Sequence, residues 1–83
     1  SRDDAQAVAW FGEAARRAHH PSQVLLARAL ISGTGIAADA VEAHRWLARA
    51  AQAGNTAAPG ELQSLEKSMD AVTLERARAL GPH

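Results

Sequence analysis

The chain reads Ala-Val-Ala-Trp-Phe-Gly-Glu-Ala-Ala at residues 7–15 and Ala-His-Arg-Trp-Leu-Ala-Arg-Ala-Ala at residues 43–51. Trp10 thus recurs as Trp46, and the alanine pair that follows recurs with it, 36 residues later. A repeat of this length is typical of helical-hairpin solenoids, in which each unit is too short to bury its own apolar face and must stack on its neighbours. The repeat therefore predicts an all-α fold, an α/α-hairpin solenoid of about five helices.

The composition agrees with helices. The 83 residues suffice for one domain, and with one Phe, two Trp, one Met and no Tyr the core must be built from many small side chains, above all alanine. Alanine favours helices over sheets. Nine Lys and Arg balance nine Asp and Glu, and the two signs alternate along the chain. Because phosphate binding usually needs a stripe of basic residues, we do not expect a nucleic-acid partner.

The chain has no cysteine, which excludes disulfides, thiolate metal sites and a cysteine nucleophile. No apolar run approaches the roughly 18 residues that span a bilayer, so we expect no membrane span in this piece. The sequence opens Ser1-Arg2-Asp3, without a methionine or a signal-peptide pattern. We therefore expect it to be a processed piece of a longer protein.

Apolar spacing predicts three helices in the first two thirds of the chain. The first starts after the candidate caps Asp3 or Asp4, runs to about residue 18, and is broken by His19-His20-Pro21. The second runs from about Ser22 to Ser32. The inward residues are expected to be Ala7, Phe11, Ala14, Ala15 and Ala18 in the first helix and Ser22, Leu25, Leu26, Ala29 and Leu30 in the second.

Gly33-Thr34-Gly35 is expected to reverse the chain direction, and the apolar side chain of Ile36 is expected to be buried within the hairpin. Asp39 should cap the third helix, which runs to about residue 53 and ends at Gly54-Asn55. Its inward residues repeat the offsets of the first helix and are Ala43, Leu47, Ala50, Ala51 and Gly54.

The repeat decays in the last third of the chain. Residues 56–60 are expected to form a loop or a ragged helix start, and Asp70 is a second candidate cap. Gly81-Pro82 should stop the final helix, and the whole segment fits the terminal element that a solenoid needs. The apolar residues of these two helices are Leu62, Leu65 and Met69, then Val72, Leu74, Ala77 and Leu80.

These stretches resemble the Sel1-like repeat family, which is related to the tetratricopeptide repeats. The likeness of the first helix of the repeat rests on Leu26-Ala27-x-x-Leu30-x-x-Gly33-x-Gly35-Ile36. That of the second helix rests on Asp39-x-x-Glu42-Ala43-x-x-Trp46-Leu47-x-x-Ala50-Ala51-x-x-Gly54-Asn55. Residues 4–19 resemble the same second helix of a preceding repeat, and residues 65–80 resemble the tail that closes such arrays. Three positions depart from the family pattern: Ala27 and Ala18 stand where it has glycine, and Leu30 stands where it has tyrosine.

The resemblance implies the C-terminal piece of a repeat array. Residues 1–20 would be the second helix of a truncated repeat, residues 21–55 one complete repeat, and residues 56–83 the capping helices. The family implies a scaffold without enzyme activity or cofactor that binds a protein or peptide, commonly in bacterial signalling, envelope or polar-assembly complexes. The compartment stays open between bacterial cytoplasm and periplasm.

The first helix has no predicted hairpin partner. Val8, Trp10 and Phe11 should be covered by a preceding helix that this chain lacks. We expect either that the native protein continues upstream or that a partner helix covers this face. A third interpretation is homo-association, in which the uncovered first helix pairs with its copy in another chain.

First helices of such hairpins usually line the concave side, so we expect Gln23, Ala27, Arg28 and Ile31 to face a groove. Gln23 and Arg28 can bind backbone or carboxylate groups of a peptide, and Ile31 offers an apolar contact. The candidate partner-binding residues are Gln23, Arg28, Ile31, Val8 and Trp10.

Trp10 and Trp46 are candidate partner contacts, since tryptophan is enriched in binding hot spots, but matched aromatics in one repeat phase favour a place in the core. We assign structural roles to Phe11, Leu26, Leu30, Gly33, Gly35, Ile36, Ala43, Trp46, Leu47, Ala50, Ala51 and Gly54.

No pattern indicates catalysis or metal binding. His19 and His20 lie near His44 only if the fold brings them there, and without a carboxylate or cysteine at ligand spacing we interpret them as solvated loop histidines. The serines and threonines have no accompanying His-Asp arrangement. A hydrolase remains an alternative because some cysteine-rich members of the family are linked to β-lactam binding, but the missing cysteines and the missing nucleophile–base pair count against it.

Overall fold

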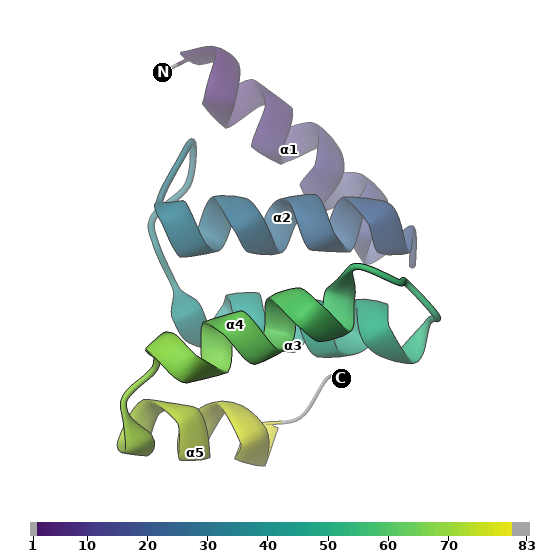
Figure 1. The fold of residues 1–83 in the computed structure, drawn as a ribbon. Coiled ribbons are helices and arrows are strands. Elements are labelled where there is room, and N and C mark those ends of the chain that lie inside the picture. The colour runs from purple at the N-terminus through teal and green to yellow at the C-terminus, as the bar shows by residue number, and fades with distance from the viewer. Residues whose placement is uncertain (1, 81–83) are drawn as a thin grey trace.

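The computed structural model describes residues 2–80, and this part of the chain contains five helices and no strand (Figure 1). The all-α prediction is confirmed. The helices are α1 (Arg2–Arg16), α2 (His20–Ser32), α3 (Ala40–Gln52), α4 (Ala58–Ser68) and α5 (Ala71–Leu80).

Each helix packs against the next one along the chain until the last, which returns to an earlier helix. α2 lies between α1 and α3, α4 packs on α3, and α5 also packs on α3 (Figure 1). Because α2 and α3 are joined by a short loop and lie side by side, they form an antiparallel hairpin. Within residues 2–80, α1 packs mainly on α2, so one side of α1 lacks a neighbouring helix.

The core is made of small side chains and leucines. Alanines at the contacts between helices let the axes approach closely, and leucines fill the remaining space. Leu47, at the centre of α3, is completely buried. The buried core residues are Val8, Ala15, Val24, Leu26, Ala27, Ala29, Leu30, Ala43, Leu47, Ala50, Ala58 and Leu65.

The loop between α2 and α3 touches the backbone of α1 at Gly35. Gly35 has a φ of +76°, and a Cβ atom there would lie 2.5 Å from the carbonyl oxygen of Asp4. Only glycine fits this approach without strain. The loop therefore ties the α2–α3 hairpin to the first turn of α1.

Both predicted carboxylate caps are confirmed. Asp39 accepts a hydrogen bond from the backbone N–H of Glu42 at 3.1 Å, and Asp70 accepts one from the backbone N–H of Thr73 at 2.7 Å. Each carboxylate satisfies a donor that the helix itself leaves free.

Several predicted helix limits are wrong by about two residues. α1 includes Asp3 and Asp4 in its first turn and ends at Arg16, before the predicted residue 18. α2 starts at His20 instead of Ser22, because Pro21 has no N–H to satisfy and its fixed φ suits a first helical turn. The predicted stop at Gly81-Pro82 lies outside the described residues.

Some residues expected to face inward are exposed. Ala7 lies on the side of α1 that has no neighbouring helix, and Ala18 and Gly54 lie beyond the ends of α1 and α3. The side chain of Ile36 is not buried within the hairpin but is exposed at the edge of a pocket that Leu26 and Trp46 also line. The apolar side chains of Leu25, Val72 and Leu80 are exposed as well.

None of the helices within residues 2–80 has the length and apolar character that crossing a membrane requires.

Candidate functional site

Two of the α2 residues expected to face a groove are buried. Gln23 is only 2% exposed and Ala27 is fully buried, so the prediction of their exposure is wrong. The reason is that α2 is covered by α1 on one side and by α3 on the other. The side-chain amide of Gln23 donates to the carbonyl oxygen of Ala15 at 3.1 Å, which links α2 to α1 instead of to a ligand.

Arg28 is exposed but engaged within the molecule. Its guanidinium donates to both carboxylate oxygens of Glu61 in α4, at 2.8 and 2.5 Å. The hydrogen bonds to Glu61 raise the pKa of Arg28 above its ordinary value, and the hydrogen bond from Arg28 lowers the pKa of Glu61. This bidentate pair joins α2 to α4, so a partner would have to compete with Glu61 for Arg28.

Ile31 lies at the same junction between α2 and α4. Its side chain is partly exposed and borders a shallow pocket of about 210 Å³, whose other lining residues come from α4. Of the α2 candidates, Ile31 is thus the one that offers an accessible apolar contact.

Val8, Phe11 and Trp10 differ in their surroundings. Val8 was expected to be uncovered, but it is only 7% exposed because it faces α2, so that prediction is wrong. Phe11 is half-buried against the core. Trp10, a candidate partner contact, is 72% exposed, so its side chain is largely uncovered within the described residues.

The internal repeat allows a direct comparison of α1 with α3. Three of the four equivalent α3 residues are fully buried, and Trp46 is partly buried beside Leu26 and Leu30 of α2. In α1 none of the four is fully buried. The pairs are Ala7 and Ala43, Trp10 and Trp46, Phe11 and Leu47, and Ala14 and Ala50.

Helical geometry places six polar and apolar residues on one side of α1. With 3.6 residues per turn, side chains three, four and seven positions apart share a face. We call this side the α1 outer face. It comprises Asp3, Gln6, Ala7, Trp10, Glu13 and Ala14, and Arg17 follows it directly after the end of α1.

The α1 outer face is apolar in its middle and charged at its ends. A pocket of about 400 Å³ lies beside the indole of Trp10 and is lined by Ala9, Trp10 and Glu13. Glu13 and Arg17 approach to 3.8 Å with both side chains well exposed, so their attraction is weak and easily exchanged for another partner. The α1 outer face therefore suits a partner surface that is apolar in its middle and polar at both ends.

The histidines do not gather at one site. His19 Nδ1 lies 2.6 Å from the Ser22 hydroxyl, and His20 Nδ1 lies 3.1 Å from the side-chain amide of Asn55. His44 instead lies against α4, where its Nε2 is 2.7 Å from a carboxylate oxygen of Glu66. Among the described residues, no group of three or more His, Cys, Asp or Glu side chains is arranged to hold a metal ion.

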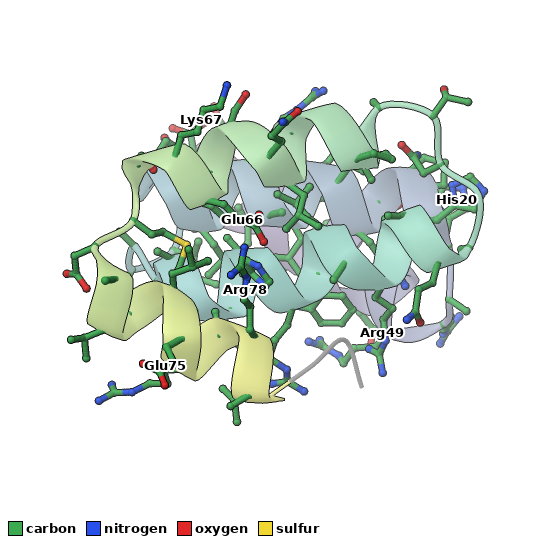
Figure 2. All side chains as sticks on the ribbon, turned by 60° about the horizontal axis from the view of Figure 1, so that its bottom comes forward. His20, Arg49, Glu66, Lys67, Glu75 and Arg78 are labelled. Carbon is green, nitrogen blue, oxygen red and sulfur yellow. The ribbon has the colours of Figure 1, made fainter. Side chains whose placement is uncertain are left out.

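The sequence analysis missed the polar cluster that joins the last three helices. The hydrogen bond from His44 is the main cause that lowers the pKa of Glu66, and Arg78 of α5 approaches the same carboxylate at 3.6 Å. Figure 2 shows Glu66 and Arg78 directed toward each other. One signal was available: His44 is the repeat equivalent of Val8, a position that faces the next helix.

The comparisons with known proteins point to one family. A family model described as the Sel1 repeat matches residues 1–19 and again residues 20–55. The two matches run without a gap over the first 55 of the 83 residues. Searches of curated proteins and of solved structures returned no significant match.

Proposed function

The chain belongs to the Sel1 repeat family, and we propose that it binds a partner protein on the α1 outer face. Sel1 repeats generally mediate protein–protein interaction and form a family of non-catalytic scaffolds. The family therefore gives the class of function, and the proposal concerns the surface that carries it.

One observation carries the proposal: Trp10 is 72% exposed, whereas its repeat equivalent Trp46 packs against the core. A large exposed aromatic surrounded by small side chains contributes much binding free energy when a partner removes it from water. Tryptophan is also among the residues most enriched at the energetic centres of protein interfaces.

The α2 residues support the proposal less. Gln23 is buried, and Arg28 is held by Glu61. Ile31 remains accessible and would extend the contact only for a partner large enough to reach the junction of α2 and α4.

Site-specific photocrosslinking tests the proposal. A photoreactive amino acid replaces Trp10 in the protein expressed in its native cells, and a matched variant carries it in place of Val72, which is 71% exposed on α5. We expect a discrete crosslinked product from position 10 and none of that mass from position 72. Identical products from both positions, or a product from position 72 alone, would exclude the α1 outer face as the binding surface.

A further inference from the structure

We infer that a groove between α1 and α3 binds an extended peptide segment of a partner protein, in which one acidic and one large apolar residue lie two positions apart. This surface is separate from the α1 outer face, so the inference goes beyond the proposed function and does not rest on it. We call it the α1–α3 groove. Arg16 and Arg49 form its basic end, and its apolar part consists of Leu26, Leu30, Ile36 and Trp46.

The groove exists because α1 and α3 both pack on α2 but hardly touch each other. α1 crosses behind α2, and its C-terminal end approaches the C-terminal end of α3 (Figure 1). Two pockets occupy the gap that remains, and they are adjacent because the side chain of Arg16 borders both. The groove lies on a different side of α2 from Ile31, which borders α4.

The larger of the two pockets suits one large apolar side chain. It measures about 350 Å³, and its apolar lining comes from both helices of the hairpin and from Ile36 in the loop between them. Ile36 is 37% exposed, and Trp46 is only partly buried. An apolar side chain that enters the pocket removes this surface from water, and an aromatic ring can also pack against the indole.

The smaller pocket, of about 200 Å³, is bordered by the side chains of Arg16 and Arg49. Within residues 2–80 neither of these arginines forms an ion pair. The Arg49 guanidinium carbon lies 5.1 Å from the centroid of the Trp46 ring, so the indole holds this cation beside the apolar pocket. Two neighbouring cations without an acidic partner favour a carboxylate ligand.

Gln23 adds a hydrogen-bond acceptor at the floor of the smaller pocket. Its side-chain N–H donates to the carbonyl oxygen of Ala15, whereas its Oε1 is buried and has no hydrogen-bond partner among the described residues. A buried acceptor without a donor costs free energy, which an N–H of a ligand can recover. A peptide backbone brings N–H groups next to its carboxylate side chain, and a simple organic acid brings none. This favours a peptide as the ligand.

The opposite end of the groove disfavours a second carboxylate. Asp39 and Glu42 border the larger pocket there, and both are engaged: Asp39 caps α3, and Glu42 pairs with Arg45. The acidic residue of the ligand therefore belongs at the basic end. In an extended peptide, side chains two positions apart lie on the same side about 7 Å apart, a spacing that allows one to reach the arginines and the other the apolar pocket.

Titration of synthetic probes into the isotope-labelled protein, followed by NMR, tests the inference. Each probe is an acetylated and amidated peptide of Gly and Ser with one Glu and one Phe two positions apart, so that its only carboxylate is the Glu side chain. Both orders of Glu and Phe are used, because the groove fixes their spacing and not the chain direction. For the tighter order we expect a Kd below about 1 mM, with shifts of the Trp46 indole and Ile36 amide signals and none of the Trp10 indole signal.

Paired changes in probe and protein identify the ionic contact. Replacing the Glu of the probe by Gln should weaken binding about three- to fivefold, and so should Arg16→Gln or Arg49→Gln in the protein. Neither arginine variant should weaken binding of the Gln probe further, because the contact is already lost there. Arg76→Gln, which changes an exposed arginine on α5, is the matched control and should leave the affinity unchanged.

A second pair of variants identifies the apolar contact without truncating the tryptophan. Ile36→Ala should weaken binding about threefold or more, since it removes part of the surface that the Phe side chain covers. Ile31→Ala, at a similarly exposed isoleucine on α2, is the control and should have no effect. Replacing the Phe of the probe by Ala should remove detectable binding.

Several results would overturn the inference. These are an unshifted Trp46 signal at millimolar probe, equal binding of the Glu and Gln probes, and a shift of Trp10 in place of Trp46. A dimer that forms without probe and is lost in Arg49→Gln, seen by sedimentation, would make a second copy the occupant. A longer form of the protein whose Trp46 signal is already in the bound position would make a segment of the same polypeptide the occupant. The crosslink from position 10 is independent of all these results, so the proposed function and this inference can fail separately.

Discussion

Ala18 has a φ of +67°, in the left-handed region that residues with a Cβ atom rarely adopt. Its repeat equivalent is Gly54, which has a φ of +96° and follows α3 as Ala18 follows α1. Both residues reverse the backbone just beyond a helix end, where glycine is usually found. Alanine at position 18, where the family pattern has glycine, therefore lowers the free energy of unfolding through local backbone strain.

We predict that Ala18→Gly stabilises the protein. Relief of the left-handed strain should outweigh the greater freedom of glycine in the unfolded chain and raise the free energy of unfolding by about 0.5–1 kcal/mol. Urea denaturation measures this. Ala9→Gly, at an exposed position in the middle of α1, is the control and should destabilise by about 1 kcal/mol. A loss of stability in Ala18→Gly would contradict the assignment of strain.

The two tryptophans should respond differently to truncation. Trp46→Ala removes an indole that packs against the core and lies 5.1 Å below the Arg49 guanidinium, so it should cost about 2 kcal/mol. Trp10→Ala should cost less than about 1 kcal/mol because its side chain is already mostly in water. Thermal melts of both variants check this, and equal losses would mean that Trp10 is covered in solution.

At the scale of the helices, Glu66 of α4 joins three elements. It pairs with His44 of α3 and approaches Arg78 of α5. This carboxylate links α5 to α4, in addition to the packing of α5 on α3 and the burial of Ala77. Part of the attachment of α5 therefore depends on one ionised group.

We predict that this dependence appears as acid sensitivity. The pKa of Glu66 is lowered below its usual 4.5, first by the hydrogen bond from His44. A carboxyl whose pKa is lower in the folded state stabilises it fully above the unfolded value, and this contribution is lost as the pH falls through the folded-state pKa. Stability should therefore decline below pH 4.5, and Glu66→Gln should remove part of that decline.

Denaturation between neutral and acidic pH measures the effect. Glu75→Gln, an exposed glutamate on α5, is the matched control and should keep the decline of the original protein. If Glu66→Gln and the original protein lose stability in parallel as the pH falls, the pairing of Glu66 does not contribute.

The same elements show what the sequence could predict. The Trp10 and Trp46 repeat predicts the helices and their order because local periodicity and capping act within a few residues. Arg28 and Glu61 are 33 residues apart in the sequence, and His44 and Glu66 are 22 apart, so no local pattern predicts these contacts. The burial of Gln23 was missed because a single apolar stripe predicts one covered face, whereas α2 is covered on two.

The candidate site was predicted only in part for a related reason. Equivalent sequence positions indicate equivalent environments only when the neighbouring elements are equivalent too. Trp10 and Trp46 share a repeat phase, but Trp46 has α2 beside it and Trp10 has no corresponding helix within residues 2–80. The exposure of Trp10 therefore follows from the number of helices that neighbour α1 and not from the residue type.

At the scale of the whole molecule, burial is distributed unevenly along the array. α2 contributes seven buried residues and α3 four, whereas α4 contributes two and α5 one. In a solenoid each element is stabilised mainly by its immediate neighbours, so elements covered on one side open more easily than those covered on two. The centre of the array should thus be its most stable part.

We predict that amide hydrogen exchange follows this gradient. Amides of α2 and α3 should exchange most slowly, and those of α1 and α5 faster, because α1 packs mainly on α2 and α5 mainly on α3. A partner bound to the α1 outer face would give α1 a second neighbour and should slow exchange in α1 more than in α5. Protection in α1 that already equals that of α2 without a partner would count against the α1 outer face as the binding surface.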